Sequence, residues 1–403
     1  LNEEGNIGHL TKAAHLFKIF SNEQKSIISY LIKEFEMRKS ADEHKRTKVS
    51  KTGILNPNKL HAFKFSEDIF LRNSVVSDGK NHGFVMFVDW SGSMMPQMAD
   101  TIDQLMMLAM FCKKTQIPFD VYAFTNTYCK SYEGARGYHK FPDRKNGDLG
   151  LAKSFNLLHL ISSTLKTSAF NKSMTYVSFL RHMFAYHTRG WDAPYFPVLE
   201  HLKLGGTPLN EAIMSAISIV PEFQKTNNVQ IVNTIFLTDG EGQDRQVSYD
   251  SQAGDFIDTT YFGSGKSVIV DPVTKKHYES SINDKVLLKI LKERTGTTLA
   301  GFFISPANKK QFSTDMWFKG VPTQEEVAVL WDSMKDNGFC VVETAGYDEY
   351  YILARKNLRI ESNNLDGIKS DMTKGKMKNA FVKAQQGKIA NKKMLSKFAE
   401  LVA

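Results

Sequence analysis

Oxygen-bearing side chains occupy every second position where one apolar segment of the chain ends. Residues 83–89 (GFVMFVD) form a short continuous apolar run, which predicts a strand buried on both faces. Asp89 closes this strand, and Ser91 and Ser93 follow it. Carboxylate and hydroxyl oxygens are the ligands that a small, hard divalent cation requires. The spacing therefore predicts one part of a cation site.

Two further oxygen donors stand at corresponding points of the predicted sheet. Thr207 follows two glycines in LGGTPLNEA and opens a predicted helix, and Asp239 ends the predicted strand 229–239 in FLTDGEG. In open α/β sheets, ligand sites gather beyond the carboxyl ends of the strands, so we expect the three loops to converge. A set of carboxylates and hydroxyls without histidine or thiolate favours Mg²⁺, with Mn²⁺ as a substitute, over Zn²⁺ or Cu²⁺. An open coordination position would accept a carboxylate from another protein.

A simpler interpretation gives the hydroxyl side chains a purely structural role. Ser91 and Ser93 would cap the helix that follows them, and Thr207 would cap its own. Capping does not explain why aspartates at two strand ends accompany these hydroxyls.

The elements that must position the donors alternate as in an α/β fold. The predicted elements are strand 83–89, helix 98–115, strand 119–125, helix 207–223, strand 229–239, a β-hairpin within 261–279, helix 285–295, strand 298–305, helix 325–337 and strands 338–343 and 349–355. Strand, helix and strand at this spacing form a βαβ unit. The expected architecture is a doubly wound, Rossmann-like sheet with helices on both faces.

Other segments are expected to attach to this domain, which spans residues 81–357. Residues 9–50 predict two helices with a cap at Ser21 or Asn22 between them, and 47–78 predict an irregular linker. Residues 130–200 are interpreted as a helical insertion with helical runs at 154–166 and 174–187. Residues 358–403 predict a basic helical tail, since nine lysines lie between Gly367 and Ala403 against two acidic residues.

The three loops together resemble a known family. VDWSGSM, GGTPL and LTDGEG resemble the metal-ion-dependent adhesion site of a von Willebrand factor A (VWA) domain. The resemblance implies a VWA fold over residues 82 to about 357, apart from the insertion. It also implies that a cation is surrounded by all the donors named above, Asp89, Ser91, Ser93, Thr207 and Asp239.

A closer resemblance involves the segment that precedes the domain. RTKVSKTGILNPNKL (46–60) ahead of a VWA domain is similar to the CobT-type subunit of the aerobic cobalt chelatase and to shorter homologues of large tailed phages. It implies a hexameric MoxR-type AAA+ ATPase or its client as partner, in a chelatase-like complex whose insertion chemistry resides in a third subunit. This chain would be a non-catalytic accessory subunit. It departs from cellular members by lacking their acidic stretch and by carrying the insertion.

Two alternative functions rest on other residues. The basic tail would contact nucleic acid in a VWA scaffold protein. In a true chelatase component, the insertion would present the substrate metal through histidines, which are His139, His159, His182, His187 and the nearby His201.

Several signals argue against catalysis, nucleotide binding and membrane insertion. GSGKS (263–267) lacks the first glycine of a phosphate loop, because position 260 is Thr260, and strand-like SVIV follows it. No HExxH or GxSxG motif is present. Three cysteines without a CxxC pair, no signal peptide and no run of ~18 apolar residues predict a cytoplasmic protein, bacterial or in the host cytoplasm of a phage.

Overall fold

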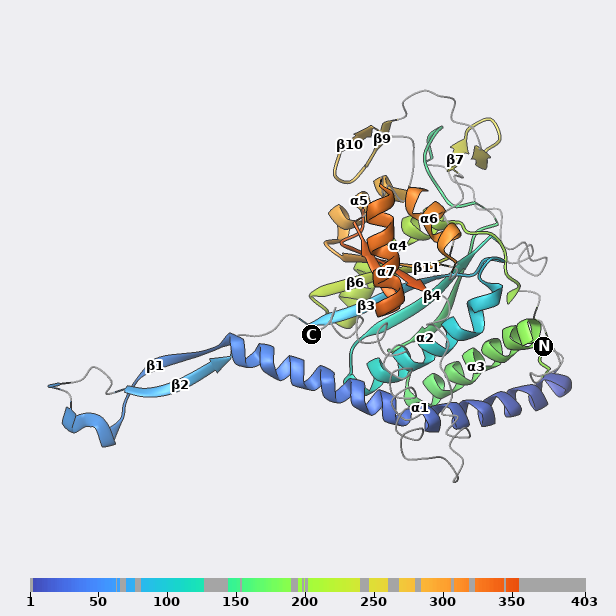
Figure 1. The fold of residues 1–403 in the computed structure, drawn as a ribbon. Helices are drawn as coiled ribbons and strands as arrows, with labels where there is room; N and C mark the ends of the chain where they lie inside the picture. The colour runs from blue at the N-terminus through green and yellow to red at the C-terminus, as the bar shows by residue number, and fades with distance from the viewer. Residues whose placement is uncertain are drawn as a thin grey trace, which may run out of the picture.

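Seven strands of the computed structural model form one mixed, mostly parallel sheet (Figure 1). Their order across the sheet is β12 (Phe339–Val342), β13 (Glu349–Ala354), β11 (Thr298–Ser305), β6 (Ile231–Thr238), β3 (His82–Asp89), β4 (Phe119–Thr125) and β5 (Asn156–Ser162). The pairs from β13 to β4 are parallel, while β12 and β5 are antiparallel to their neighbours. The predicted α/β fold class is therefore confirmed.

The structure describes most of the chain up to residue 354. The described residues are 3–62, 64–65, 70–76, 81–126, 144–152, 154–189, 195–197, 199, 202–239, 246–259, 268–279, 284–305, 308–318, 323–343 and 346–354. The predicted basic tail at 358–403, the GSGKS loop, Cys129, His139 and His201 lie outside them. Within the described residues, no helix is both long and apolar enough to cross a bilayer.

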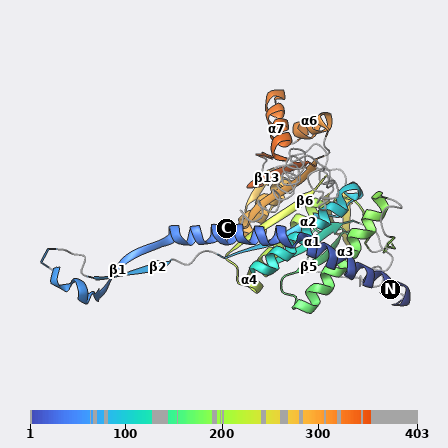
Figure 2. The same cartoon turned by 60° about the horizontal axis from the view of Figure 1, so that its bottom comes forward.

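Helices cover both faces of the sheet, as Figures 1 and 2 show. Alternate residues of β3 divide between the two layers. Met86 and Val88 pack with helices α1 (Glu3–Arg46), α2 (Met95–Thr115) and α3 (Thr167–Arg189). Val85 and Phe87 pack with α4 (Leu209–Asn227) and α5 (Asp284–Thr295), and α6 (Lys309–Phe318) and α7 (Gln324–Asn337) continue that layer over β11–β13. Both faces of the central strands are buried, which explains their continuous apolar sequences.

One long helix replaces the two helices expected near the N-terminus. α1 runs for 44 residues, so the predicted cap at Ser21 or Asn22 is wrong. The apolar spacing passes through this point, because Phe17 and Phe20 before it and Ile28 and Leu31 after it all pack against the same core cluster. Spacings of three and eight residues, close to whole numbers of helical turns, place them on one helical face.

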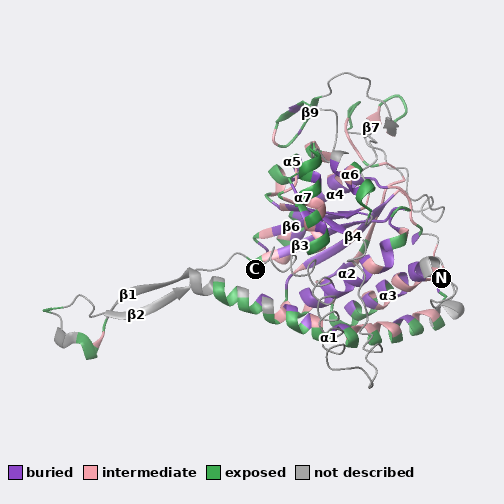
Figure 3. Ribbon diagram, in the orientation of Figure 1, coloured by how far each residue is buried: buried purple, intermediate pink, exposed green. Residues whose placement is uncertain are grey.

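The segment expected to be an irregular linker is a β-hairpin. β1 (Thr47–Leu55) and β2 (Phe70–Val76) pair antiparallel, with a 3₁₀ helix (Pro57–Ala62) between them. The correction has a local cause, since alternate positions of β1 carry Thr47 and Val49, and residues of this kind favour strands even in a polar sequence. Figure 1 shows the hairpin at the far end of α1, projecting away from the sheet. Figure 3 shows buried positions along the part of α1 that crosses the helical layer.

The expected helical insertion also needs correction. Residues 154–166 were predicted to be helical, but β5 lies within them and forms one edge of the main sheet by pairing with β4. The helix predicted at 174–187 is present as part of α3, and its buried residues belong to the main core. Three small elements were not predicted, namely α6, β7 (Gln246–Asp250) and β8 (Asp255–Thr259), whereas β9 (Val268–Val270) and β10 (His277–Glu279) form the expected hairpin.

Candidate cation site

The first two donor loops are held together by backbone hydrogen bonds. Gly92 N donates to Gly205 O at 2.8 Å, and Gly205 N donates to Trp90 O at 3.1 Å. The fully buried Trp90 side chain adds a hydrogen bond from Nε1 to Leu202 O at 3.0 Å. At the end of β4, Asn126 Oδ1 accepts from Gly206 N at 2.5 Å. The loop after β3 and the loop before α4 therefore form one fixed unit at the carboxyl edge of the sheet.

Asp89 is the most buried of the predicted ligands. Its Oδ2 accepts hydrogen bonds from Thr238 Oγ1 at 2.7 Å and from Thr207 Oγ1 at 3.4 Å. Its Oδ1 is buried and has no hydrogen-bond partner among the described residues. Burial raises the pKa of Asp89 to about 7, and the hydrogen bond from Thr238 opposes this rise. An ionised carboxylate at this depth calls for a compensating positive charge.

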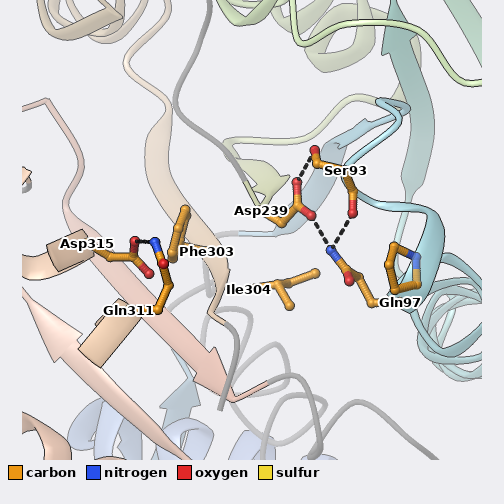
Figure 4. Close-up of a pocket in the computed structure, with 8 residues that line it drawn as sticks. Ser93, Gln97, Asp239, Phe303, Ile304, Gln311 and Asp315 are labelled. Carbon is orange, nitrogen blue, oxygen red and sulfur yellow. Dashed lines mark hydrogen bonds between the residues drawn. The ribbon is translucent and has the colours of Figure 1, made fainter. Parts of the chain in front are cut away.

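Asp239 lies at the more open end of the same cluster. Ser93 Oγ donates to Asp239 Oδ1 at 2.7 Å, and the hydroxyl oxygens of Ser91 and Ser93 are 2.9 Å apart. Gln97, one helical turn beyond Ser93 on α2, donates its side-chain amide to the other oxygen of Asp239 (Figure 4). The hydroxyls of Ser91 and Ser93 thus belong to one hydrogen-bonded chain that ends at Asp239.

The capping interpretation of the hydroxyl side chains is wrong. α2 begins after Met94 and α4 begins after Pro208, and neither helix has a side-chain cap hydrogen bond. The hydroxyls of Ser93 and Thr207 point instead to aspartate carboxylates. A cluster of this kind, with one orphaned buried carboxylate oxygen, fits a hard divalent cation.

The donor set consists of two carboxylates and three hydroxyls. No group of three or more His, Cys, Asp or Glu side chains that could hold a metal exists within the described residues. The ring of His159 stacks on Tyr122 with centroids 4.5 Å apart, and that of His182 stacks on Phe196 at 5.5 Å. Neither histidine belongs to a group of metal-ligating side chains among the described residues, so the oxygen cluster is the candidate cation site of this part of the chain.

Sequence reasoning missed three residues that support the predicted ligands. Thr238 immediately precedes Asp239 and reaches Asp89 from the neighbouring strand. Gln97 stands four residues after Ser93, and this helical spacing could have identified it. Asn126 had no local signal, because only the packing of β4 beside β3 brings it to the second loop.

A pocket of about 240 Å³ opens beside Asp239. Ser93, Gln97 and Asp239 line one side, Phe303 and Ile304 at the end of β11 lie between, and Gln311 and Asp315 of α6 line the other side (Figure 4). The pocket therefore joins the candidate cation site to a second polar group on a different helix.

Comparisons with known proteins give only distant similarities. No family model matches the chain, and no curated protein matches it either. The pilus adhesin SpaC from Lactobacillus rhamnosus GG, in its open conformation, is 14% identical over 62% of this chain and 26% of the adhesin, with a TM-score of 0.31. A second SpaC crystal structure is 12% identical over 64% of this chain and 28% of that one, with a TM-score of 0.29.

The pilus tip protein Mfa5 from Porphyromonas gingivalis shares still less. A structure of its three N-terminal domains is 9% identical over 40% of this chain and 20% of that chain, with a TM-score of 0.22. The chain spans about a quarter of the SpaC structure. Similarity at this level carries no information on function.

Proposed function

We propose that this chain is a Mg²⁺-dependent protein-binding module. The cation would be held by the five predicted ligands, which are Asp89, Ser91, Ser93, Thr207 and Asp239. One observation carries the proposal: the buried Asp89 has one oxygen with no hydrogen-bond partner among the described residues, while its other oxygen accepts from the hydroxyls of Thr207 and Thr238. A Mg²⁺ ion bound there would supply an open coordination position for a carboxylate of a partner protein.

Different side chains hold the two aspartates in place. Thr238 and Thr207 hold one oxygen of Asp89, and the other would be left for the cation. Ser93 and Gln97 hold Asp239. Because the two loops that carry Ser91 and Thr207 are joined through their backbones, little rearrangement is needed to present the ligands. Such preorganisation reduces the entropic cost of binding.

The proposed partner is a MoxR-type AAA+ ATPase or its client, in a chelatase-like complex. This part of the proposal rests on the sequence resemblance to CobT-type subunits alone. Nucleic-acid binding through the basic tail is the competing proposal, and it differs in its response to salt and to chelation.

Direct metal titration tests the cation site. We expect the wild-type protein to take up one Mn²⁺ per chain, measured by loss of the free Mn²⁺ signal in electron paramagnetic resonance, and to release it to excess Mg²⁺. Asp89→Asn and Asp239→Asn should bind none. Asp332→Asn, which alters an exposed carboxylate on α7, is the matched control and should bind normally. Normal Mn²⁺ uptake by a folded Asp89→Asn protein would refute the site.

Capture from the native cell extract tests the partner. Wild type in Mg²⁺ should retain an AAA+ ATPase that is absent with Asp89→Asn or in EDTA, with mass spectrometry as the readout. If the same proteins are captured with and without Mg²⁺, and are lost in high salt or after nuclease treatment, the result would instead support the nucleic-acid proposal.

A further inference from the structure

The pocket beside the cation site is lined by a second carboxylate, that of Asp315. Asp315 is half-buried on α6, and both of its carboxylate oxygens accept hydrogen bonds from neutral groups, Gln311 Nε2 at 2.9 Å and Ser305 Oγ at 3.3 Å. Among the described residues, no lysine or arginine forms an ion pair with it. Its negative charge therefore faces the pocket without a countercharge from the described chain.

The size and lining of the pocket indicate what it would accept. About 240 Å³ is below the range of roughly 300–1,000 Å³ that is typical of small-molecule sites, so one side chain fits better than a cofactor. Phe303 and Ile304 supply an apolar middle, which suits the methylene stem of a long basic side chain. The side-chain carbonyl oxygen of Gln311 adds an acceptor next to the carboxylate.

We propose that Asp315 and Gln311 form a subsite for an arginine side chain of the partner, close to the carboxylate that the cation site would bind. Arginine is favoured over lysine because its planar guanidinium donates to a carboxylate and a neighbouring amide oxygen at once. A partner carboxylate is disfavoured at this end because Asp315 repels it. This inference rests on the proposed function, since the recognised segment would carry one acidic and one arginine side chain.

Synthetic peptides test the subsite. The probes are fluorescein-labelled, capped nonapeptides of glycine and serine that contain one Asp and one Arg separated by zero to four residues. Matched probes carry citrulline, the neutral isostere of arginine, or Asn in place of Asp. Binding to the full chain is measured by fluorescence anisotropy in Mg²⁺ and in EDTA.

We expect at least one spacing to bind in Mg²⁺ about tenfold more tightly with arginine than with citrulline, the effect of one charge-assisted contact. Asp315→Asn should abolish this preference while keeping the requirement for Asp and Mg²⁺. Asp315→Arg should reverse it, so that a peptide with Glu in place of Arg binds better. Asp332→Asn should behave as wild type.

The failures of the two proposals can be told apart by Mn²⁺ titration of the same proteins. Equal binding of arginine and citrulline peptides, or no Mg²⁺-dependent binding of any peptide, overturns the subsite, and normal Mn²⁺ uptake then leaves the cation site standing. Absence of Mn²⁺ uptake by the wild type overturns the proposed function itself.

Discussion

Thr238, the last residue of β6, donates its hydroxyl hydrogen to Oδ2 of Asp89, the last residue of the neighbouring strand β3, at 2.7 Å. The two side chains come from strands whose register is continuous up to this point, with Val88 paired to Leu237. The carboxylate is thereby held at one oxygen, while its second oxygen is buried without a hydrogen-bond partner among the described residues.

Replacing this hydroxyl should weaken cation binding without removing a ligand. Thr238→Val keeps the shape of the side chain but loses the hydrogen bond, which is worth about 1 kcal/mol, so the affinity for Mn²⁺ should fall about fivefold. Thr238→Ser retains the hydroxyl and should stay close to wild type. Identical Mn²⁺ titrations for wild type and Thr238→Val would show that Thr238 does not position Asp89.

Neutralising Asp89 should stabilise the metal-free protein. Burial raises the pKa of Asp89 to about 7, so at pH 8 the folded state carries an ionised carboxylate in an unfavourable environment. Asp89→Asn removes that charge at equal size. We expect its melting temperature in EDTA to exceed that of wild type, and Mg²⁺ to raise the melting temperature of wild type only. A variant that melts below wild type in EDTA would contradict this account.

The stability of the metal-free protein should depend on pH through the same group. Between about pH 4 and pH 7 the unfolded chain has released the Asp89 proton while the folded chain retains it, so this group lowers the free energy of unfolding as the pH rises. Urea unfolding of wild type and Asp89→Asn in EDTA, at pH 5 and pH 7.5, isolates the contribution. The wild type should lose stability relative to the variant at the higher pH, whereas a constant difference would refute the raised pKa.

Cation affinity should show the opposite trend with pH. A bound cation requires the ionised carboxylate, so below pH 7 a proton must leave Asp89 first. Mn²⁺ affinity should therefore fall by about tenfold for each pH unit below 7 and level off above it. An affinity that is flat from pH 5.5 to pH 7 would exclude Asp89 as the linked group.

A buried ion pair joins α2 to α3, and we expect it to contribute to the free energy of unfolding but not to cation binding. Arg181 donates to Asp103 from Nε at 3.0 Å and from an Nη atom at 2.9 Å, and the Asp103 side chain is only 4% exposed. Arg181→Ala removes the cation beside that buried carboxylate, so we expect a loss of about 3–5 kcal/mol in urea unfolding. Lys335→Ala, which breaks an exposed pair with Asp332, should leave the free energy of unfolding close to that of the wild type. Comparable losses for the two variants would contradict this distinction.

The sequence predicted the central strands well because both faces of these strands are buried, which gives them continuous apolar sequences. β4 and β11 coincide with the predicted strands 119–125 and 298–305, and β3 differs from its prediction by a single residue. β5 was mistaken for a helix, since NLLHLIS lies at the sheet edge, where burial on only part of its length weakens the periodic signal. Short apolar segments of this kind fit a strand or a helix equally well until their neighbours are known.

The candidate site, too, could be predicted from the sequence only in part. Asp89, Ser91 and Ser93 lie in one loop, so their spacing alone suggested chemistry, and the topology of α/β sheets predicted that Thr207 and Asp239 would join them. The structure brings these residues together in two hydrogen-bonded groups, Thr207 with Asp89 and the two serines with Asp239, on loops that are joined through their backbones. Asp315 could not be predicted, because α6 reaches the site only through packing against β11.

The length of α1 has a mechanical consequence. Among the side chains of α1 that the structure describes, Phe35 is the last buried one. Its ring packs edge-on against Phe111 near the end of α2, and the helix continues to Arg46, where the hairpin begins. At 1.5 Å per residue, the stretch from Phe35 to Arg46 is about 16 Å long. A force applied to the hairpin would therefore be transmitted along α1 to its contact with α2. The opposite end of α2 carries Gln97, which contacts Asp239.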